Sequence, residues 1–189
     1  MDDVVPSPAR WTAATVYPDM WTDPDQDPRN SEGPAPEGEL ATLEEYLRDY
    51  RATLLMKCEG LDAEQLARRS VPPSTMSLLG LLRHLAEVEQ DWQGWLEPDL
   101  DHPTLYGHPD GDFDGARPEE GLVREAREAL AREQAQTDAA LARYPDLGTR
   151  LEPSGSSIRE IRVHLIEEYA RHCGHADLLR ECVDGRVGQ

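Results

Sequence analysis

The chain has 189 residues, and its 38 Asp and Glu residues outnumber its 19 Lys and Arg residues to give a formal net charge of −19. Such a negative field repels nucleic-acid backbones and anionic lipid surfaces, so we expect neither class of partner. The sequence has no run of about 18 apolar residues, and its N-terminus, MDDVVPSPAR, is acidic, which argues against a membrane span and a secretory signal. Three cysteines without a CxxC motif favour a reducing compartment, and we expect a cytoplasmic protein.

Residues 1–36 hold seven of the 15 prolines, which excludes a long helix in this stretch. The same stretch contains Trp11, Tyr17, Met20 and Trp21, and disordered tails rarely keep such side chains. We predict an extended N-terminal arm that packs these side chains onto the domain and has a flexible acidic piece around residues 23–33.

Helical periodicity begins near Glu37, where leucines start to recur at spacings of three and four residues. The pattern predicts a first helix over residues 37–58, which Gly60 ends in the manner of a C-terminal cap. A short helical turn is expected at residues 61–66. Two consecutive prolines, at positions 72 and 73, then break the chain before the next helix.

Three further helices are expected, at residues 77–96, 118–144 and 157–185. A stretch without periodicity, residues 97–117, predicts a long loop between the second and third helices, and Pro118 is expected at the first position of the third. No alternating strand pattern occurs in the sequence. The pattern therefore predicts an all-α four-helix bundle over residues 37–185, followed by a tail at 186–189.

Four polar residues lie along one side of the fourth predicted helix. His164, Glu168 and His172 are each four residues apart, and His175 follows three residues later. Successive members turn by only about 40° around the helix axis, so all four share one side. Glu168 and His172 fall at the border of the apolar stripe, where an unpaired carboxylate is costly to bury. A bound metal ion is one way to compensate this cost.

His84 supplies a third candidate ligand, at the edge of the leucine face of the second helix. Two ligands on one helix and one from a facing helix leave a position open for water or substrate. Zinc and nickel favour imidazoles with one carboxylate. In the alternative interpretation, His84 is a hydrogen-bonded edge histidine and Glu168 pairs with Arg83 or Arg171. The spacing alone does not separate the two interpretations.

Two long blocks resemble the DinB-like (YfiT-like) superfamily of four-helix bundles, and within it an actinobacterial branch of the mini-circle-protein type. They are RHLAEVEQDW, which starts at Arg83, and VHLIEEYARHCGHADLLRECVDG at residues 163–185. Members bind a divalent metal through a histidine of the second helix and two residues one turn apart on the fourth. A similar protein, the mycothiol-dependent maleylpyruvate isomerase, uses Glu and then His. The resemblance therefore implies His84, Glu168 and His172 as ligands of a divalent metal ion.

The same resemblance bears on the neighbouring histidines and on function. His175 stands where many members have Gln, which implies that it supports a ligand, and His164 remains an alternative ligand one turn before Glu168. Superfamily members carry out transfer or isomerisation with low-molecular-weight thiols such as mycothiol or bacillithiol. The resemblance implies a thiol S-transferase acting on a small-molecule electrophile. A metal-dependent hydrolase and a non-catalytic, stress-associated binding protein are the alternatives, and a homodimer is expected because bundles of this family often pair.

The other motifs in the sequence are weaker evidence of function. The segment HLIEE ends in Glu where the inverted zinc-protease motif needs His, which argues against a protease. The segment DGDFDG at residues 110–115 begins like a calcium loop, but Gly121 stands where a bidentate Glu is needed, and a solvated acidic loop is expected instead. Cys58, Cys173 and Cys182 have no visible base, so we do not expect a thiol nucleophile.

Two pairs of ring-bearing side chains complete the sequence-based expectations. His102 and His108 lie in the predicted long loop, where we expect them to be exposed. Trp92 and Trp95 are expected to form core and pocket wall, because the acidic chain makes a platform for nucleic-acid bases improbable.

Overall fold

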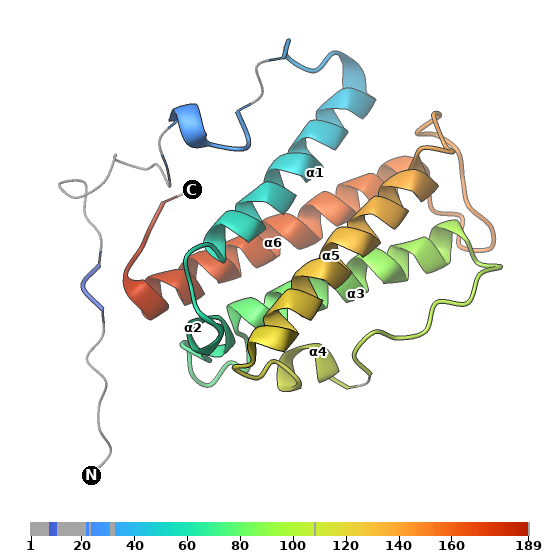
Figure 1. The fold of residues 1–189 in the computed structure, drawn as a ribbon. Helices are drawn as coiled ribbons and strands as arrows, with labels where there is room; N and C mark the ends of the chain where they lie inside the picture. The colour runs from blue at the N-terminus through green and yellow to red at the C-terminus, as the bar shows by residue number, and fades with distance from the viewer. Residues whose placement is uncertain (1–7, 11–21, 23, 31–32, 108, 189) are drawn as a thin grey trace.

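A computed structural model describes residues 8–10, 22, 24–30, 33–107 and 109–188. No strand is assigned among these residues, apart from one isolated bridge between Arg150 and Ser157. The four long helices are α1 (Gly38–Lys57), α3 (Leu78–Leu96), α5 (Glu120–Leu141) and α6 (Ile158–Asp184). Three short elements join them: η1 (Pro24–Gln26), α2 (Ala63–Ala67) and α4 (Gly111–Asp114). The predicted all-α four-helix bundle is confirmed (Figure 1).

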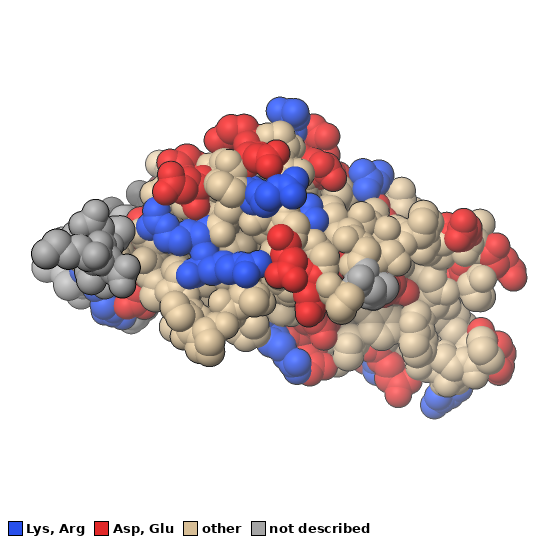
Figure 2. All heavy atoms as spheres, turned by 90° about the horizontal axis from the view of Figure 1, so that it is seen from below, with Lys and Arg blue, Asp and Glu red and all other residues tan. Residues whose placement is uncertain are grey.

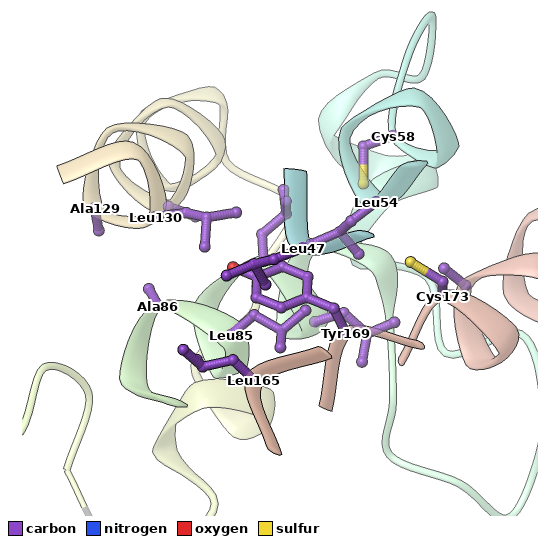
Figure 3. Close-up of a cluster of buried hydrophobic side chains, with 14 of the residues drawn as sticks. Leu47, Leu54, Cys58, Leu85, Ala86, Ala129, Leu130, Leu165, Tyr169 and Cys173 are labelled. Atoms are coloured by element: carbon purple, nitrogen blue, oxygen red, sulfur yellow. The ribbon is translucent and has the colours of Figure 1, made fainter. Parts of the chain in front are cut away.

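The bundle is built from two helix pairs. Helix α1 packs against α6 and α3 packs against α5, while contacts between α3 and α6 join the two pairs. Side chains from all four helices meet in one core, where Leu54, Leu85, Leu165 and Tyr169 are completely buried (Figure 3). Burial of each such side chain favours folding by about 1.5–3 kcal/mol, so this core fixes the rotation of each helix about its axis. None of the helices in the described part of the chain has the length and apolar character of a membrane span.

Serine caps define where the two site-bearing helices start. The Ser77 side chain accepts a hydrogen bond from the backbone N–H of Gly80 at the start of α3. Ser157 and Glu160 form a capping box at the start of α6. At the other end of α6, Gly185 adopts the left-handed conformation with φ of 81°. The positions of His84 on α3 and of Glu168 and His172 on α6 are thereby set along the helix axes.

Two expectations about the connection between α3 and α5 are wrong. Helix α5 starts at Glu120 rather than Pro118, because Glu119 takes the N-cap position with an extended backbone. The expected loop at residues 97–117 contains the four-residue helix α4, which packs against α3. A single helical turn is too short to give a periodic pattern of apolar residues, so the sequence does not reveal it.

The described parts of the N-terminal arm contact the bundle. Arg10 Nε donates to Glu181 Oε1 of α6 at 2.6 Å. The piece around residues 23–33, which we predict to be flexible, includes η1, and in it Arg29 pairs with Asp27 and donates to Thr53 of α1. The predicted packing of Trp11, Tyr17, Met20 and Trp21 lies outside the described residues. The predicted domain boundaries at residues 36 and 185 stay predictions.

Charged side chains of both signs share the face of the molecule drawn in Figure 2, which is the view from below Figure 1. Over one half of this face, acidic and basic side chains lie next to one another, and other residues cover most of the remaining half. Neighbouring basic side chains therefore offset part of the surplus negative charge locally.

Candidate metal centre

Helix α6 brings Glu168 and His172 to the side that faces α3. The two residues lie one helical turn apart. The side chains of Leu165, Tyr169 and Cys173, on the adjacent face of the helix, are buried in the core. His172 is buried, with 8% of its surface exposed, and the Glu168 side chain is 19% exposed. The carboxylate and the imidazole thus sit at the edge of the core, close to solvent but mostly shielded from it.

His84 of α3 meets these two residues. It follows the buried Leu81 and Leu82 and precedes the buried Leu85, and its side chain is 26% exposed. The ring centroids of His84 and His172 are 4.6 Å apart. His84, Glu168 and His172 each offer one ligand atom, and these three atoms lie within 4.8 Å of one another. The structure therefore brings together the three residues that the resemblance implies.

No Lys or Arg among the described residues pairs with Glu168. Its carboxylate oxygens lie 3.5 Å from His172 Nε2 and 3.6 Å from His164 Nε2. The alternative pairing with Arg83 or Arg171 is wrong, because Arg83 donates to the backbone of Gly111 and Asp112, and Arg171 donates to Glu167. A half-buried carboxylate is thus left without a compensating cation from the protein.

The imidazole of His172 is neutral at pH 7. Burial, together with the neighbouring His84, His175 and Arg171, lowers its pKa to about 4. A neutral imidazole keeps a lone pair on one ring nitrogen, which is the form that binds metal ions. The neutral state also means that His172 cannot neutralise the charge of Glu168.

Two further histidines flank the triad on α6. His175 Nδ1 lies 3.3 Å from His172 Nδ1, so one of these imidazoles can donate to the other. The His164 side chain is 46% exposed, and its ring stacks edge-on against Trp92 with centroids 4.8 Å apart. His175 thus contacts a candidate ligand from outside, whereas His164 lies next to the carboxylate at the solvent border.

The structure adds a residue that sequence reasoning missed. Asp112, in α4, lies with Oδ2 2.8 Å from His84 Nδ1, and it is buried, with 6% of its surface exposed. The expectation of a solvated acidic loop is therefore wrong for Asp112. Phe113, the next residue, stacks against the His84 ring with centroids 5.3 Å apart. The one available signal was an apolar Phe inside an otherwise polar and acidic segment.

The donor set fits a divalent cation. Two imidazoles and one carboxylate are ligands that zinc and other borderline divalent metals accept, and three protein ligands leave one position open. The unpaired charge of Glu168 is what a bound cation would neutralise, and the neutral His172 supplies a lone pair.

The remaining candidates from the sequence do not join this site. His102 Nε2 lies 3.3 Å from the carbonyl oxygen of Glu97, and it is half-buried rather than exposed; His108 lies outside the described residues. Burial raises the pKa of the Cys58 and Cys173 thiols to about 12, so neither thiol is a nucleophile at neutral pH. Trp92 is half-buried beside His164, whereas Trp95 is 48% exposed.

Comparison with known proteins identifies the family. A family model for mycothiol S-transferases matches residues 42–185, which include α1 from its fifth residue, all of α3, α5 and α6, and every residue of the candidate site. A search of curated proteins finds no match to the chain. The chain belongs to the mycothiol S-transferase family, a member of the DinB-like superfamily.

Proposed function

We propose that this protein is a metal-dependent S-transferase that joins a low-molecular-weight thiol, mycothiol, to a small electrophile. His84, Glu168 and His172 would hold a divalent ion, zinc or nickel. The observation that carries the proposal is the convergence of one ligand atom from each of these three side chains within 4.8 Å, with no Lys or Arg of the described chain paired with the carboxylate. Membership of the mycothiol S-transferase family supplies the thiol.

The proposed chemistry follows from the donor set. When bound, a divalent ion lowers the pKa of a coordinated thiol, so that a thiolate is available at neutral pH. A carbon–sulfur bond then forms, the bond from carbon to the leaving group breaks, and its electron pair leaves with that group. The thiol proton is released to solvent. The residues of this chain would hold the ion and exclude water on the core side, and both substrates would approach from the solvent side.

Each neighbouring residue has a proposed part in this arrangement. His175 would steady His172 through the contact between their Nδ1 atoms. His164 Nε2 lies 3.6 Å from Glu168 Oε1, and it would be the alternative ligand if the His172→Ala variant kept its ion. A hydrolase would use the same open position for water. The family match favours the transferase over the hydrolase and over a non-catalytic binding protein.

The experiment measures metal content and thiol transfer in the same preparations. Protein purified without an affinity tag is expected to contain about one zinc or nickel ion per chain by elemental analysis. It is also expected to conjugate mycothiol to monochlorobimane. His172→Ala and Glu168→Gln should remove the ion and lower kcat/KM more than 100-fold, whereas His102→Ala, outside the site, should change neither. Re-addition of metal should restore a chelator-treated wild type only.

Three results would contradict the proposal. One is metal that stays at full stoichiometry in the His84→Ala/His172→Ala double variant, which would place the ion elsewhere. Another is thiol transfer that is unchanged after metal removal. The third is a metal-loaded protein that lacks thiol transfer but is much more stable than the metal-free form, which would indicate a structural ion.

A further inference from the structure

We infer that Asp112 is a positioning residue for the proposed metal centre: its carboxylate holds His84 in the tautomer that directs the Nε2 lone pair toward the ion. The inference rests on the proposed metal site. It makes helix α4, in the connection between α3 and α5, a functional part of that site rather than a linker.

The hydrogen bond between the two side chains fixes where the proton of His84 lies. Asp112 Oδ2 is 2.8 Å from His84 Nδ1, and Asp112 Oδ1 accepts from the backbone N–H of Phe113 at 2.9 Å. An ionised carboxylate only accepts hydrogen bonds, so Nδ1 of a neutral His84 must carry the proton. The lone pair is then on Nε2, as in metal sites where a carboxylate orients a histidine ligand.

The turn that carries Asp112 is fastened to the residue next to His84. Arg83 Nε donates to the carbonyl oxygen of Asp112 at 2.8 Å, and Arg83 Nη2 donates to that of Gly111 at 3.0 Å. Arg83 is itself buried, and its guanidinium lies 3.7 Å from the centre of the Tyr106 ring. Arg83 therefore binds the backbone of the α4 turn, and His84, the next residue of α3, binds the side chain of Asp112 in the same turn.

The local backbone is adapted to this close approach. A Cβ atom at Gly115, directly after α4, would lie 2.6 Å from Arg83 Nη2 and 2.7 Å from the carbonyl oxygen of Gly111, so a larger residue would force the guanidinium and the turn to shift. The ring of Phe113 covers one side of His84, and the His172 ring lies edge-on to it. His84 is thus held by contacts from α4 as well as α6, and the hydrogen bond to Asp112 decides which ring nitrogen is free.

The first test reads the tautomer directly in metal-free protein. Long-range ¹H–¹⁵N NMR at pH 8, where imidazoles are neutral, distinguishes a proton on Nδ1 from one on Nε2. Comparison with His84→Gln assigns the signal. We expect Nδ1–H in the wild type and in Asp114→Asn, a matched control on the same helix whose side chain is 64% exposed. Asp112→Ala should shift His84 to Nε2–H, the form that free imidazole side chains favour.

The second test measures zinc affinity by competition with a chromophoric chelator. Asp112→Ala should weaken zinc binding by about 10–100-fold, the usual cost of losing such a partner. Asp112→Asn still offers an acceptor oxygen, so it should lose less, and Asp114→Asn should stay within about twofold of the wild type. If Asp112→Ala does not fold, as judged by circular dichroism, Asp112→Asn decides the question.

Each outcome bears on one claim. An Nε2–H tautomer in the wild type, or unchanged zinc affinity in the Asp112 variants, would overturn the inference. A wild type that binds no zinc or nickel would overturn the proposed function, while the tautomer in metal-free protein would still report whether Asp112 orients His84. The two failures are therefore distinguishable.

Discussion

The surroundings of two carboxylates of this bundle, Glu89 and Glu168, differ. Glu89 of α3 is completely buried, and its Oε1 lies 2.8 Å from Arg51 Nη2 of α1 and accepts from the Tyr169 hydroxyl of α6 at 2.8 Å. Burial alone would lower the pKa of Arg51, but Glu89, Tyr169 and Asp138 together outweigh burial and raise it. Burial, together with the Glu89 carboxylate, raises the pKa of the Tyr169 hydroxyl, so Tyr169 stays protonated as a donor.

Glu168 precedes Tyr169 in the sequence and lies about 100° from it around the axis of α6, at the edge of the core. It meets only imidazoles, at 3.5 and 3.6 Å, and no Lys or Arg of the described chain pairs with it. The bundle thus neutralises one interior carboxylate with its own arginine and leaves the other to converge with His84 and His172. The difference separates a carboxylate that holds the fold together from one whose proposed role is to bind a cation.

The same substitution at the two positions gives the largest expected contrast. Glu89→Gln leaves the charge of Arg51 with only the exposed Asp138 as partner, so we expect the free energy of unfolding to fall by about 3 kcal/mol, with or without metal. Glu168→Gln removes an unpaired charge, so the metal-free protein should be unchanged or up to about 1 kcal/mol more stable. Urea unfolding of metal-free and zinc-loaded samples measures both.

The gain in stability when zinc is added is the second difference expected between the two variants. The wild type and Glu89→Gln should both gain stability when zinc is added, whereas Glu168→Gln should gain little, because only a native state that binds the ion is stabilised by it. If Glu168→Gln destabilises the metal-free protein as much as Glu89→Gln does, Glu168 is a structural residue and the comparison fails.

The sequence could predict that Glu168 and His172 lie together, but it could not predict the partners of Glu89 or the contact between His84 and Asp112. Glu168 and His172 are one turn apart on a strongly periodic helix, so their shared side follows from helix geometry, and the resemblance adds His84. The pairs Glu89–Tyr169 and His84–Asp112 are separated by 80 and 28 residues, and no local pattern connects their members. Such contacts depend on how the helices pack and how a single turn of α4 folds back onto α3, which periodicity does not encode.

A fall in pH should lower the stability of the folded protein through His172. His172 has a pKa of about 4 in the folded protein and about 6.5 in an unfolded chain, so between these values the unfolded chain binds a proton that the folded one does not. The contribution of the neutral imidazole is complete above pH 6.5 and is lost as the pH falls toward 4. At pH 5 the loss should be about 2 kcal/mol.

The measurement compares metal-free wild type with metal-free His172→Gln by urea unfolding at pH 7.5 and pH 5. Carboxylates elsewhere titrate equally in both proteins, so the wild type should lose about 2 kcal/mol more than the variant. An equal loss in the two proteins would show that His172 is not held neutral by burial.

A smaller effect tests whether the ring of Phe113 matters to His84. A Cβ atom at Gly80 of α3 would lie 2.7 Å from Phe113 Cδ1, whereas one at Gly94 of the same helix would meet only His102, at an ordinary contact distance of 3.7 Å. Alanine is favoured over glycine inside helices by about 1 kcal/mol, so Gly94→Ala should stabilise the protein by up to that amount. Gly80→Ala must displace Phe113, and we expect a net destabilisation of about 1 kcal/mol.

The double variant Gly80→Ala/Phe113→Leu completes this test. A smaller side chain at position 113 relieves the clash, so the two substitutions should be less costly together than the sum of their separate effects, as thermal unfolding can measure. Because Phe113 follows Asp112 directly, displacing its ring in Gly80→Ala should also shift the His84 signals in NMR spectra, whereas Gly94→Ala should leave them in place. Additive stabilities and an unmoved His84 would mean that the packing of Phe113 is independent of the metal-binding side of the bundle.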